Sequence, residues 1–157
     1  MKVKLIVIGK TDESYLQTGF QKFEARLKHY IPFEFIVIQD IKNNKNLTET
    51  QQKDKEGELI LNAIESTDAL YLLDENGTHF SSVEFSEFIQ KQMLSGKKSL
   101  VFVIGGPYGF SQALYKRANG KISLSKMTFS HQMVRLIFIE QIYRGMTILK
   151  NEPYHHI

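Results

Sequence analysis

Residues 100–109 read Leu-Val-Phe-Val-Ile-Gly-Gly-Pro-Tyr-Gly, an unbroken apolar run followed by a glycine-rich turn. The run is too short for a helix and predicts a strand buried on both faces, as in a parallel sheet. The glycines adopt backbone angles closed to other residues and leave the backbone open to a ligand. Because ligands of α/β proteins bind beside the carboxyl ends of strands, we expect a small-molecule site at this turn.

Outside this stretch, strand-like and helix-like segments alternate along the chain. The spacing of apolar residues predicts strands over 3–8, 33–38, 70–73 and around 122–124, and helices over 16–30, 48–65, 81–95 and 130–150. Thr48 with Gln51, and Ser81 with Glu84, predict capping boxes at two of the helix starts. This alternation predicts an α/β fold with a mostly parallel sheet flanked by helices.

Composition limits the class of protein. A chain of 157 residues that is 42% hydrophobic predicts a single domain over residues 1–157, with a core that needs no metal or disulfide. The absence of cysteine excludes disulfides, cysteine-based zinc sites and thiol nucleophiles. No apolar run approaches the roughly 20 residues of a membrane span, and no signal-peptide pattern is present, so we expect a cytoplasmic protein without a membrane partner. The net charge of +3 only weakly favours an anionic partner.

The helix expected from about Ser130 to Lys150 is apolar almost all round. Phe138 and Ile142 mark one face, and Met133 and Ile137 extend the apolar surface to the others. A helix that is apolar on every side needs cover on every side. Burial within one subunit is one solution, but a symmetric contact with a second copy is favoured in so small a chain, and we expect a homodimer.

Three features have a plainer interpretation beside the functional one. The glycine turn matches neither Gly-x-Gly-x-x-Gly nor a Gly-Lys-Ser/Thr phosphate loop, and a tight turn without a ligand explains it equally well. His131 is a helix cap or a site residue, with the cap favoured. Asp74 and Glu75 precede Asn-Gly, so a turn is the more common use of such residues.

The C-terminal residues Tyr154, His155 and His156 directly follow the helix break at Pro153. A phenol and two imidazoles are suited to stacking on a base, moving protons and binding anions. Terminal residues are as often frayed and without function. No further ligands for a metal site are evident in the sequence, so we expect no metal. Function and fraying both remain open from these residues alone.

Several separated motifs together resemble one protein family in order and spacing. They are Leu-Asp-Glu-Asn-Gly at 73–77, the strand and glycine turn at 102–109, Leu-Ser-Lys-Met-Thr-Phe-Ser-His-Gln-Met-Val-Arg at 124–135, Glu-Gln-Ile-Tyr-Arg at 140–144 and Pro-Tyr-His at 153–155. The resemblance is to the RlmH family, ribosomal RNA large subunit methyltransferases of the SPOUT class. It spans essentially the whole chain.

The resemblance implies an S-adenosylmethionine-dependent enzyme that methylates N3 of a pseudouridine in 23S rRNA, in the helix 69 region, within the ribosome or the large subunit. It also implies a homodimer and a C-terminal trefoil knot that forms the cofactor pocket, whereas general folding rules predict an unknotted sheet. Carried onto this chain, the cofactor-binding positions are Leu73, Gly105, Leu124, Ser125, Lys126, Met127, Thr128 and Phe129.

The resemblance also suggests roles for polar residues near the C-terminus. His155 is the first candidate for assisting deprotonation of N3 or orienting the base, and Tyr154 for stacking on or hydrogen-bonding the nucleoside. Arg135 and Arg144 are expected to hold RNA phosphates or to tie the dimer together. Many family members carry Arg or Lys where this chain has His156, and a histidine holds an anion only when it is protonated.

Two rival functions share parts of this pattern. A flavodoxin-like nucleotide-binding enzyme has the same strand and helix alternation and a ligand loop, but binds flavin in preference to S-adenosylmethionine. A non-catalytic ribosome-binding factor has a basic charge, but binds ribosomes without consuming a methyl donor. Cofactor titration and methyl transfer to ribosomes distinguish the three functions.

Overall fold

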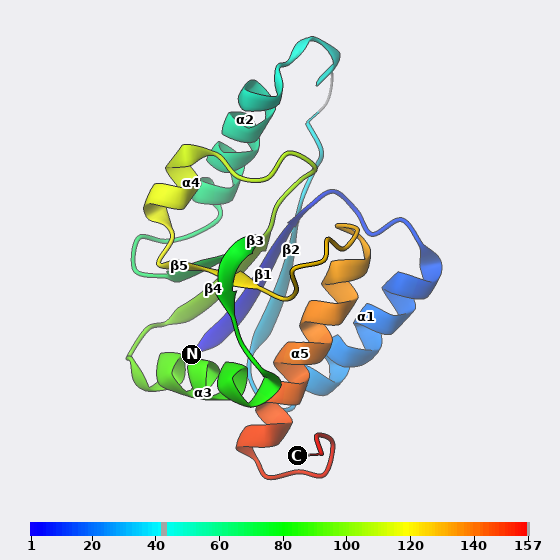
Figure 1. Cartoon of the computed structure of the whole chain (residues 1–157), viewed down its shortest axis with the longest axis vertical. Helices are drawn as coiled ribbons and strands as arrows, with labels where there is room; N and C mark the ends of the chain where they lie inside the picture. The colour runs from blue at the N-terminus through cyan, green and yellow to red at the C-terminus, as the bar shows by residue number, and fades with distance from the viewer. Residues whose placement is uncertain (42–43, 157) are drawn as a thin grey trace.

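The computed structural model describes residues 1–41 and 44–156 and has a parallel sheet with helices on both faces (Figure 1). Its five strands are β1 (Lys2–Ile8), β2 (Phe33–Ile38), β3 (Ala69–His79), β4 (Ser99–Ile104) and β5 (Gly120–Ser123). They lie in the order β2-β1-β4-β3-β5, and every neighbouring pair is parallel. The predicted α/β class with a mostly parallel sheet is therefore confirmed.

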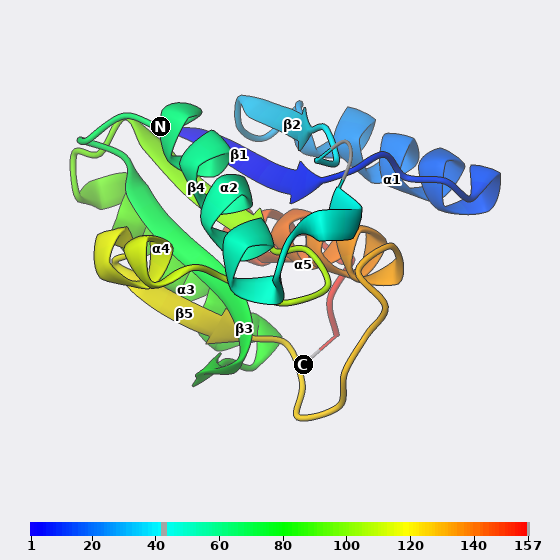
Figure 2. The same cartoon turned by 90° about the horizontal axis from the view of Figure 1, so that it is seen from above.

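The helices form two layers, one on each face of the sheet. They are α1 (Ser14–Leu27), α2 (Glu49–Asn62), α3 (Ser82–Leu94), α4 (Gln112–Arg117) and α5 (Met133–Leu149), with a short 3-10 helix at Asn44–Asn46. Helices α1, α3 and α5 cover one face, and α2 and α4 lie together on the other (Figure 2). Both predicted capping boxes are present, at Thr48 with Gln51 and at Ser81 with Glu84.

Strand β4 is the centre of the core, as its apolar run predicted. All six of its residues are buried, because β1 and β3 flank it and helices cover both its faces. Its side chains alternate between the two cores: Phe102 packs with α3 and α5, while Val101 and Val103 pack on the side of α2 and α4. The strand therefore delivers the glycine turn to the carboxyl edge of the sheet.

Strand β3 is longer than predicted. The sequence predicted a strand over 70–73 and then a turn, but β3 continues to His79. Its pairing with β5 is interrupted between Leu73 and Thr78, so residues 74–77 form an irregularity inside the strand. A Cβ on Gly77 would come within 2.6 Å of the backbone nitrogen of Ile122, so only glycine permits this approach. The acidic residues predicted for a surface turn therefore lie at the carboxyl edge of the sheet.

Helix α5 buries one face and leaves another partly exposed. Phe138, Ile142 and Met146 are at most 1% exposed in the core beside α1 and α3. Ile137 and Met133 are only half-buried. The helix predicted to be apolar all round is thus fully covered on one face within one chain, and the described residues cover the remaining apolar strip only partly.

Arg135, predicted to contact RNA or the dimer partner, is instead a core residue with 1% exposure. Its Nη2 donates to the carbonyl of Ile8 at 2.7 Å, and its Nη1 donates to the carbonyl of Gly9 at 2.9 Å. Its Nε donates to the carbonyl of His131, just before α5, at 3.1 Å. The prediction that Arg135 contacts RNA or a dimer partner is therefore wrong, because its guanidinium is buried in hydrogen bonds that join the end of β1 to the start of α5.

Glu56 on α2 is buried directly behind the glycine turn. It is 3% exposed, and its Oε1 has no hydrogen-bond partner among the described residues. Burial raises the pKa of its carboxyl, the amide of Gln52 lowers it through a hydrogen bond, and the charge of Asp40 raises it. A Cβ on Gly106 would come within 2.8 Å of Oε1, so α2 packs against the bare backbone of the turn.

Glu56→Gln is expected to gain stability over the wild type as the pH rises from about 4 to about 8. The folded state binds the Glu56 proton more tightly than the unfolded state, so wild-type stability falls as the pH rises above 4.5 through the raised pKa. Glutamine does not titrate and avoids this loss. Urea unfolding at a series of pH values measures the difference, with Glu58→Gln on the exposed side of α2 as the control. A difference that does not change with pH would contradict the prediction.

Candidate functional site

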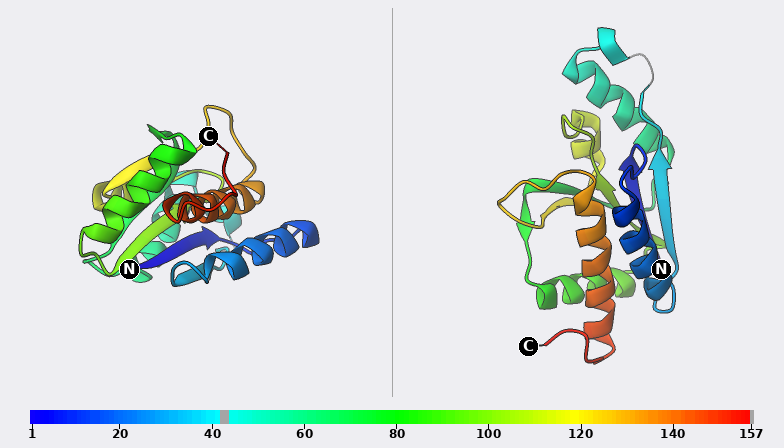
Figure 3. Two further views of the ribbon diagram at one scale, coloured as in Figure 1. Left: turned by 90° about the horizontal axis from the view of Figure 1, so that it is seen from below. Right: turned by 90° about the vertical axis from the view of Figure 1, so that its right-hand side faces the viewer.

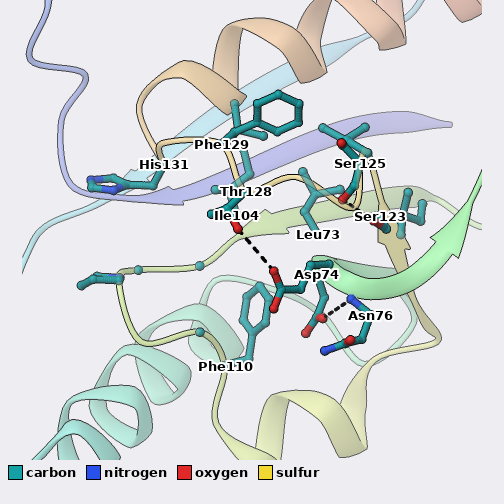
Figure 4. A pocket seen from close by; sticks show the side chains of 18 of the residues that line it. Leu73, Asp74, Asn76, Ile104, Phe110, Ser123, Ser125, Thr128, Phe129 and His131 are labelled. Atoms are coloured by element: carbon teal, nitrogen blue, oxygen red, sulfur yellow. Dashed lines mark hydrogen bonds between the residues drawn. The ribbon is translucent and has the colours of Figure 1, made fainter.

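A pocket of about 630 Å³ lies at the carboxyl ends of β3, β4 and β5 (Figure 4). Its walls come from four segments: the β3 irregularity, the glycine turn after β4, the end of β5 and the loop that leads into α5. The volume is in the usual range for small-molecule and cofactor sites. The ligand site predicted from the glycine turn is therefore matched by a cavity at that place.

Seven of the eight predicted cofactor-binding residues line this pocket. They are Leu73, Gly105, Leu124, Ser125, Met127, Thr128 and Phe129. Lys126 is exposed and lies outside this lining, so its predicted contact with the cofactor stays a prediction. The structure thus brings together residues that lie more than fifty positions apart in the chain.

Side-chain hydroxyls order the loop between β5 and α5. The Ser123 hydroxyl donates to the carbonyl of Ser125 at 3.0 Å, and the Ser125 hydroxyl accepts from the backbone N–H of Met127 at 2.9 Å. The Ser130 hydroxyl accepts from the N–H of Met133 at 3.0 Å. Such local bonds replace a sheet ladder. They hold the loop while leaving Met127 78% exposed at the pocket.

The glycine turn is closed by its own backbone. The N–H of Gly109 donates to the carbonyl of Gly106 at 3.2 Å, and Gly109 has a φ of +82°, which favours glycine. Gly105 has no such angle. A Cβ on Gly105 would meet the ring of Phe110 at 3.0 Å, so this glycine makes room for Phe110 rather than directly for a ligand. Phe110 itself lines the pocket.

Two carboxylates lie on the pocket wall, at residues that the sequence assigned to a turn. Asp74 Oδ1 accepts from the N–H of Asn76 at 2.8 Å, and its Oδ2 accepts from the hydroxyl of Tyr115. Burial and this contact raise the pKa of Tyr115 to about 12. The Thr128 hydroxyl donates to Glu75 at 3.4 Å (Figure 4). The signal for these residues was their position directly after a buried strand.

His131 lines the same pocket and is not the cap of α5. The hydroxyl of Ser130 accepts the N–H of Met133, and the residue before the helix is Gln132. The favoured prediction of a cap is therefore wrong for His131. The pocket combines apolar and acidic side chains, a mixture suited to a partly apolar ligand that carries positive charge.

The C-terminal tail is bound to α5 rather than frayed. The Tyr154 hydroxyl donates to Glu140 Oε1 at 2.9 Å, and Arg144 Nη2 contacts the same oxygen at 2.5 Å. Arg144 Nη1 lies 3.1 Å from His155 Nδ1, and the guanidinium carbon lies 4.7 Å from the centre of the Tyr154 ring. Burial and the bond to Glu140 raise the pKa of Tyr154. Arg144 is thus engaged within the chain, and its predicted contact with RNA phosphates or with a dimer partner stays a prediction.

The C-terminal tail leaves one end of α5, and the loop that forms part of the pocket wall enters the other end (Figure 3). The helix has 17 residues, which corresponds to about 25 Å at 1.5 Å per residue. The tail folds back along the helix as far as Glu140, near its middle, but the predicted catalytic residues Tyr154, His155 and the exposed His156 do not line the pocket within one chain. The order of the motifs along the sequence did not indicate that the tail residues and the pocket lie apart.

The described residues, 1–41 and 44–156, form neither an evident metal site nor a membrane-spanning helix. In this part of the chain, no group of three or more His, Asp or Glu side chains is placed to hold a metal ion. Within the same ranges, no helix is both long enough and apolar enough to cross a bilayer.

Comparison with known proteins identifies the family to which the chain is similar. A family model described as "Predicted SPOUT methyltransferase" matches residues 1–155. Proteins named ribosomal RNA large subunit methyltransferase H are similar over 156 residues, 99% of this chain and 99% of each relative. Identity is 67% to that of Flavobacterium johnsoniae, 68% to that of Flavobacterium psychrophilum and 65% to that of Parabacteroides distasonis. The chain therefore belongs to the SPOUT methyltransferase family, among the ribosomal RNA large subunit methyltransferase H proteins.

Proposed function

We propose that this chain, acting in the cytoplasm as one domain over residues 1–157, binds S-adenosylmethionine and methylates N3 of a pseudouridine in the helix 69 region of 23S rRNA. The pocket supports the cofactor, because seven residues that the family pattern assigns to S-adenosylmethionine line one cavity. The names of the relatives support a substrate in large-subunit rRNA.

The lining fits the parts of S-adenosylmethionine. Leu73, Leu124 and Phe129 offer apolar surface for the adenine, and the backbone around Gly105 offers hydrogen-bonding groups. Asp74 and Glu75 provide carboxylates for hydroxyl or ammonium groups. When bound, the cofactor supplies a methyl group on a positively charged sulfur. A pocket that holds it away from water favours reaction with an anionic nitrogen, because the two charges then neutralise each other.

A second subunit brings together the pocket and the tail, which lie apart within one chain. The partly exposed apolar strip of α5 around Ile137 is suited to a symmetric contact with a second copy. If the two α5 helices run in opposite directions, the tail of each subunit lies beside the pocket of the other. In that homodimer Tyr154 and His155 of one chain reach the nucleoside held at the partner's cofactor.

The trefoil knot belongs to this proposal as well. After β5, at one edge of the sheet, the chain crosses the carboxyl ends of the strands and begins α5 beside the end of β1. A chain that is threaded at its C-terminal segment needs such a crossing. The crossing segment contains six of the predicted cofactor-binding residues, so a knot there would close the pocket.

Calorimetric titration and radiolabelled methyl transfer test the function. We expect the purified protein to bind S-adenosylmethionine in preference to flavin mononucleotide. We also expect it to label 23S rRNA in ribosomes or large subunits that lack the modification, with the label at N3 of a pseudouridine. Preference for flavin would indicate a flavodoxin-like enzyme, and ribosome binding without transfer would indicate a non-catalytic factor; either result contradicts the proposal.

Gly105→Val is expected to weaken S-adenosylmethionine binding by tenfold or more while the chain stays folded. The branched side chain collides with the Phe110 ring, which must move into the pocket. Isothermal titration measures the affinity and circular dichroism the fold. Lys126→Ala is the control, because Lys126 lies in the same loop but outside the lining, and its affinity should equal that of the wild type. Equal affinity of Gly105→Val and the wild type would move the cofactor elsewhere.

Ile137→Asp is expected to convert a dimer into monomers or to unfold the chain. An aspartate in the apolar strip of α5 would place an unpaired charge in a buried contact. Light scattering at micromolar concentration measures the mass, and the wild type should show twice the chain mass. Leu94→Asp is the control, because Leu94 is 82% exposed at the end of α3. A monomeric wild type would disprove the homodimer.

A further inference from the structure

The hydrogen bond between Arg144 and His155 determines which imidazole nitrogen carries the proton. Arg144 Nη1 lies 3.1 Å from His155 Nδ1. A guanidinium has five N–H donors and no acceptor, so Nδ1 must offer its lone pair. A neutral imidazole that accepts at Nδ1 carries its hydrogen on Nε2. His155 is therefore held in the tautomer that presents an N–H at its outer edge.

Arg144 has little freedom to release this bond. Its Nη2 is 2.5 Å from Glu140 Oε1, one helical turn earlier on α5, and only about a quarter of its side chain is exposed. The guanidinium also lies over the ring of Tyr154, whose hydroxyl donates to the same Glu140 oxygen. Glu140, Arg144 and Tyr154 thus hold one another in place, and the imidazole of His155 is attached to this group.

This arrangement is unsuited to a general base. A base needs a free lone pair, but the lone pair at Nδ1 is engaged by Arg144, and Nε2 already carries a hydrogen. The sequence suggested His155 as a residue that assists deprotonation. The contacts of the folded chain favour the opposite hydrogen-bonding role for the same side chain.

We infer that His155 is a hydrogen-bond donor to the substrate and that Arg144 is the residue that positions it. When N3 of a uracil ring loses its proton, the negative charge spreads onto the two neighbouring carbonyl oxygens. An N–H aimed at one of these oxygens stabilises the anion that accepts the methyl group. This role rests on the proposed methyltransferase function. It adds no covalent step: the N3 proton leaves to water, and His155 keeps its own hydrogen.

Nitrogen-15 NMR of the histidine-labelled full-length protein tests the tautomer without any activity measurement. The His155 signals are assigned by their loss in His155→Gln. We expect a protonated Nε2 and an unprotonated Nδ1 in the wild type, and loss of this single pattern in Arg144→Met. The exposed His29 and His79 should give the same signals in both proteins. A protonated Nδ1 on His155 in the wild type overturns the inference.

Methyl transfer by two substitutions tests the donor role. Glutamine places an amide N–H close to the position of Nε2–H but cannot act as a base, whereas alanine provides neither. We expect His155→Ala to lower the rate by about 10²-fold to 10³-fold, and His155→Gln to stay within tenfold of the wild type. Glutamine as inactive as alanine, with the dimer mass and cofactor affinity retained, overturns the donor role.

Arg144→Met tests positioning against a purely structural role. It should lower kcat while the KM for ribosomes and the affinity for S-adenosylmethionine stay near wild-type values, because the reacting groups still bind but the donor is no longer held. Loss of affinity or of the dimer instead would show that Arg144 only supports the fold. Absence of methyl transfer in the wild type would contradict the proposed function, and the NMR result would still decide the tautomer.

Discussion

The buried guanidinium of Arg135 is the contact on which the rest of the structure depends. The carbonyls of Ile8 and Gly9 lie at the end of β1, and Arg135 donates to both of them from α5. Burial lowers the pKa of Arg135, while the carboxylates of Asp12 and Asp40 raise it and favour its charge. Because this contact fixes where α5 begins, the loop between β5 and α5 has two fixed ends. That loop is a wall of the pocket.

The pocket is built from irregular backbone that regular structure supports. A buried central strand ends in the glycine turn, a register shift in β3 places two carboxylates at the rim, and serine hydroxyls order the loop before α5. Helix α2 supports the turn from behind through Glu56, a buried acid whose Oε1 has no partner in the described part of the chain. Such a buried polar atom costs stability.

Helix α5 connects the pocket to the residues that hold the C-terminal tail. Its first turn adjoins the pocket, and Glu140 and Arg144, farther along the helix, hold Tyr154 and His155. Because these groups do not meet within one chain, the site that we propose is completed by a second copy. The same helix leaves an apolar strip partly exposed, which is the surface such a copy would cover.

The sequence by itself determined the features that depend on neighbouring residues. Apolar periodicity predicted the strands, short polar patterns predicted both capping boxes, and the turn at 105–109 predicted the ligand edge, because these signals act over a few residues. Only the tertiary structure decided that Arg135 is buried and which groups it contacts, because its partner Gly9 lies 126 residues away in the chain. It also decided that Asp74 faces a pocket and that His155 accepts from Arg144. Each of these contacts depends on which distant residues folding brings together, and local sequence patterns do not indicate such contacts.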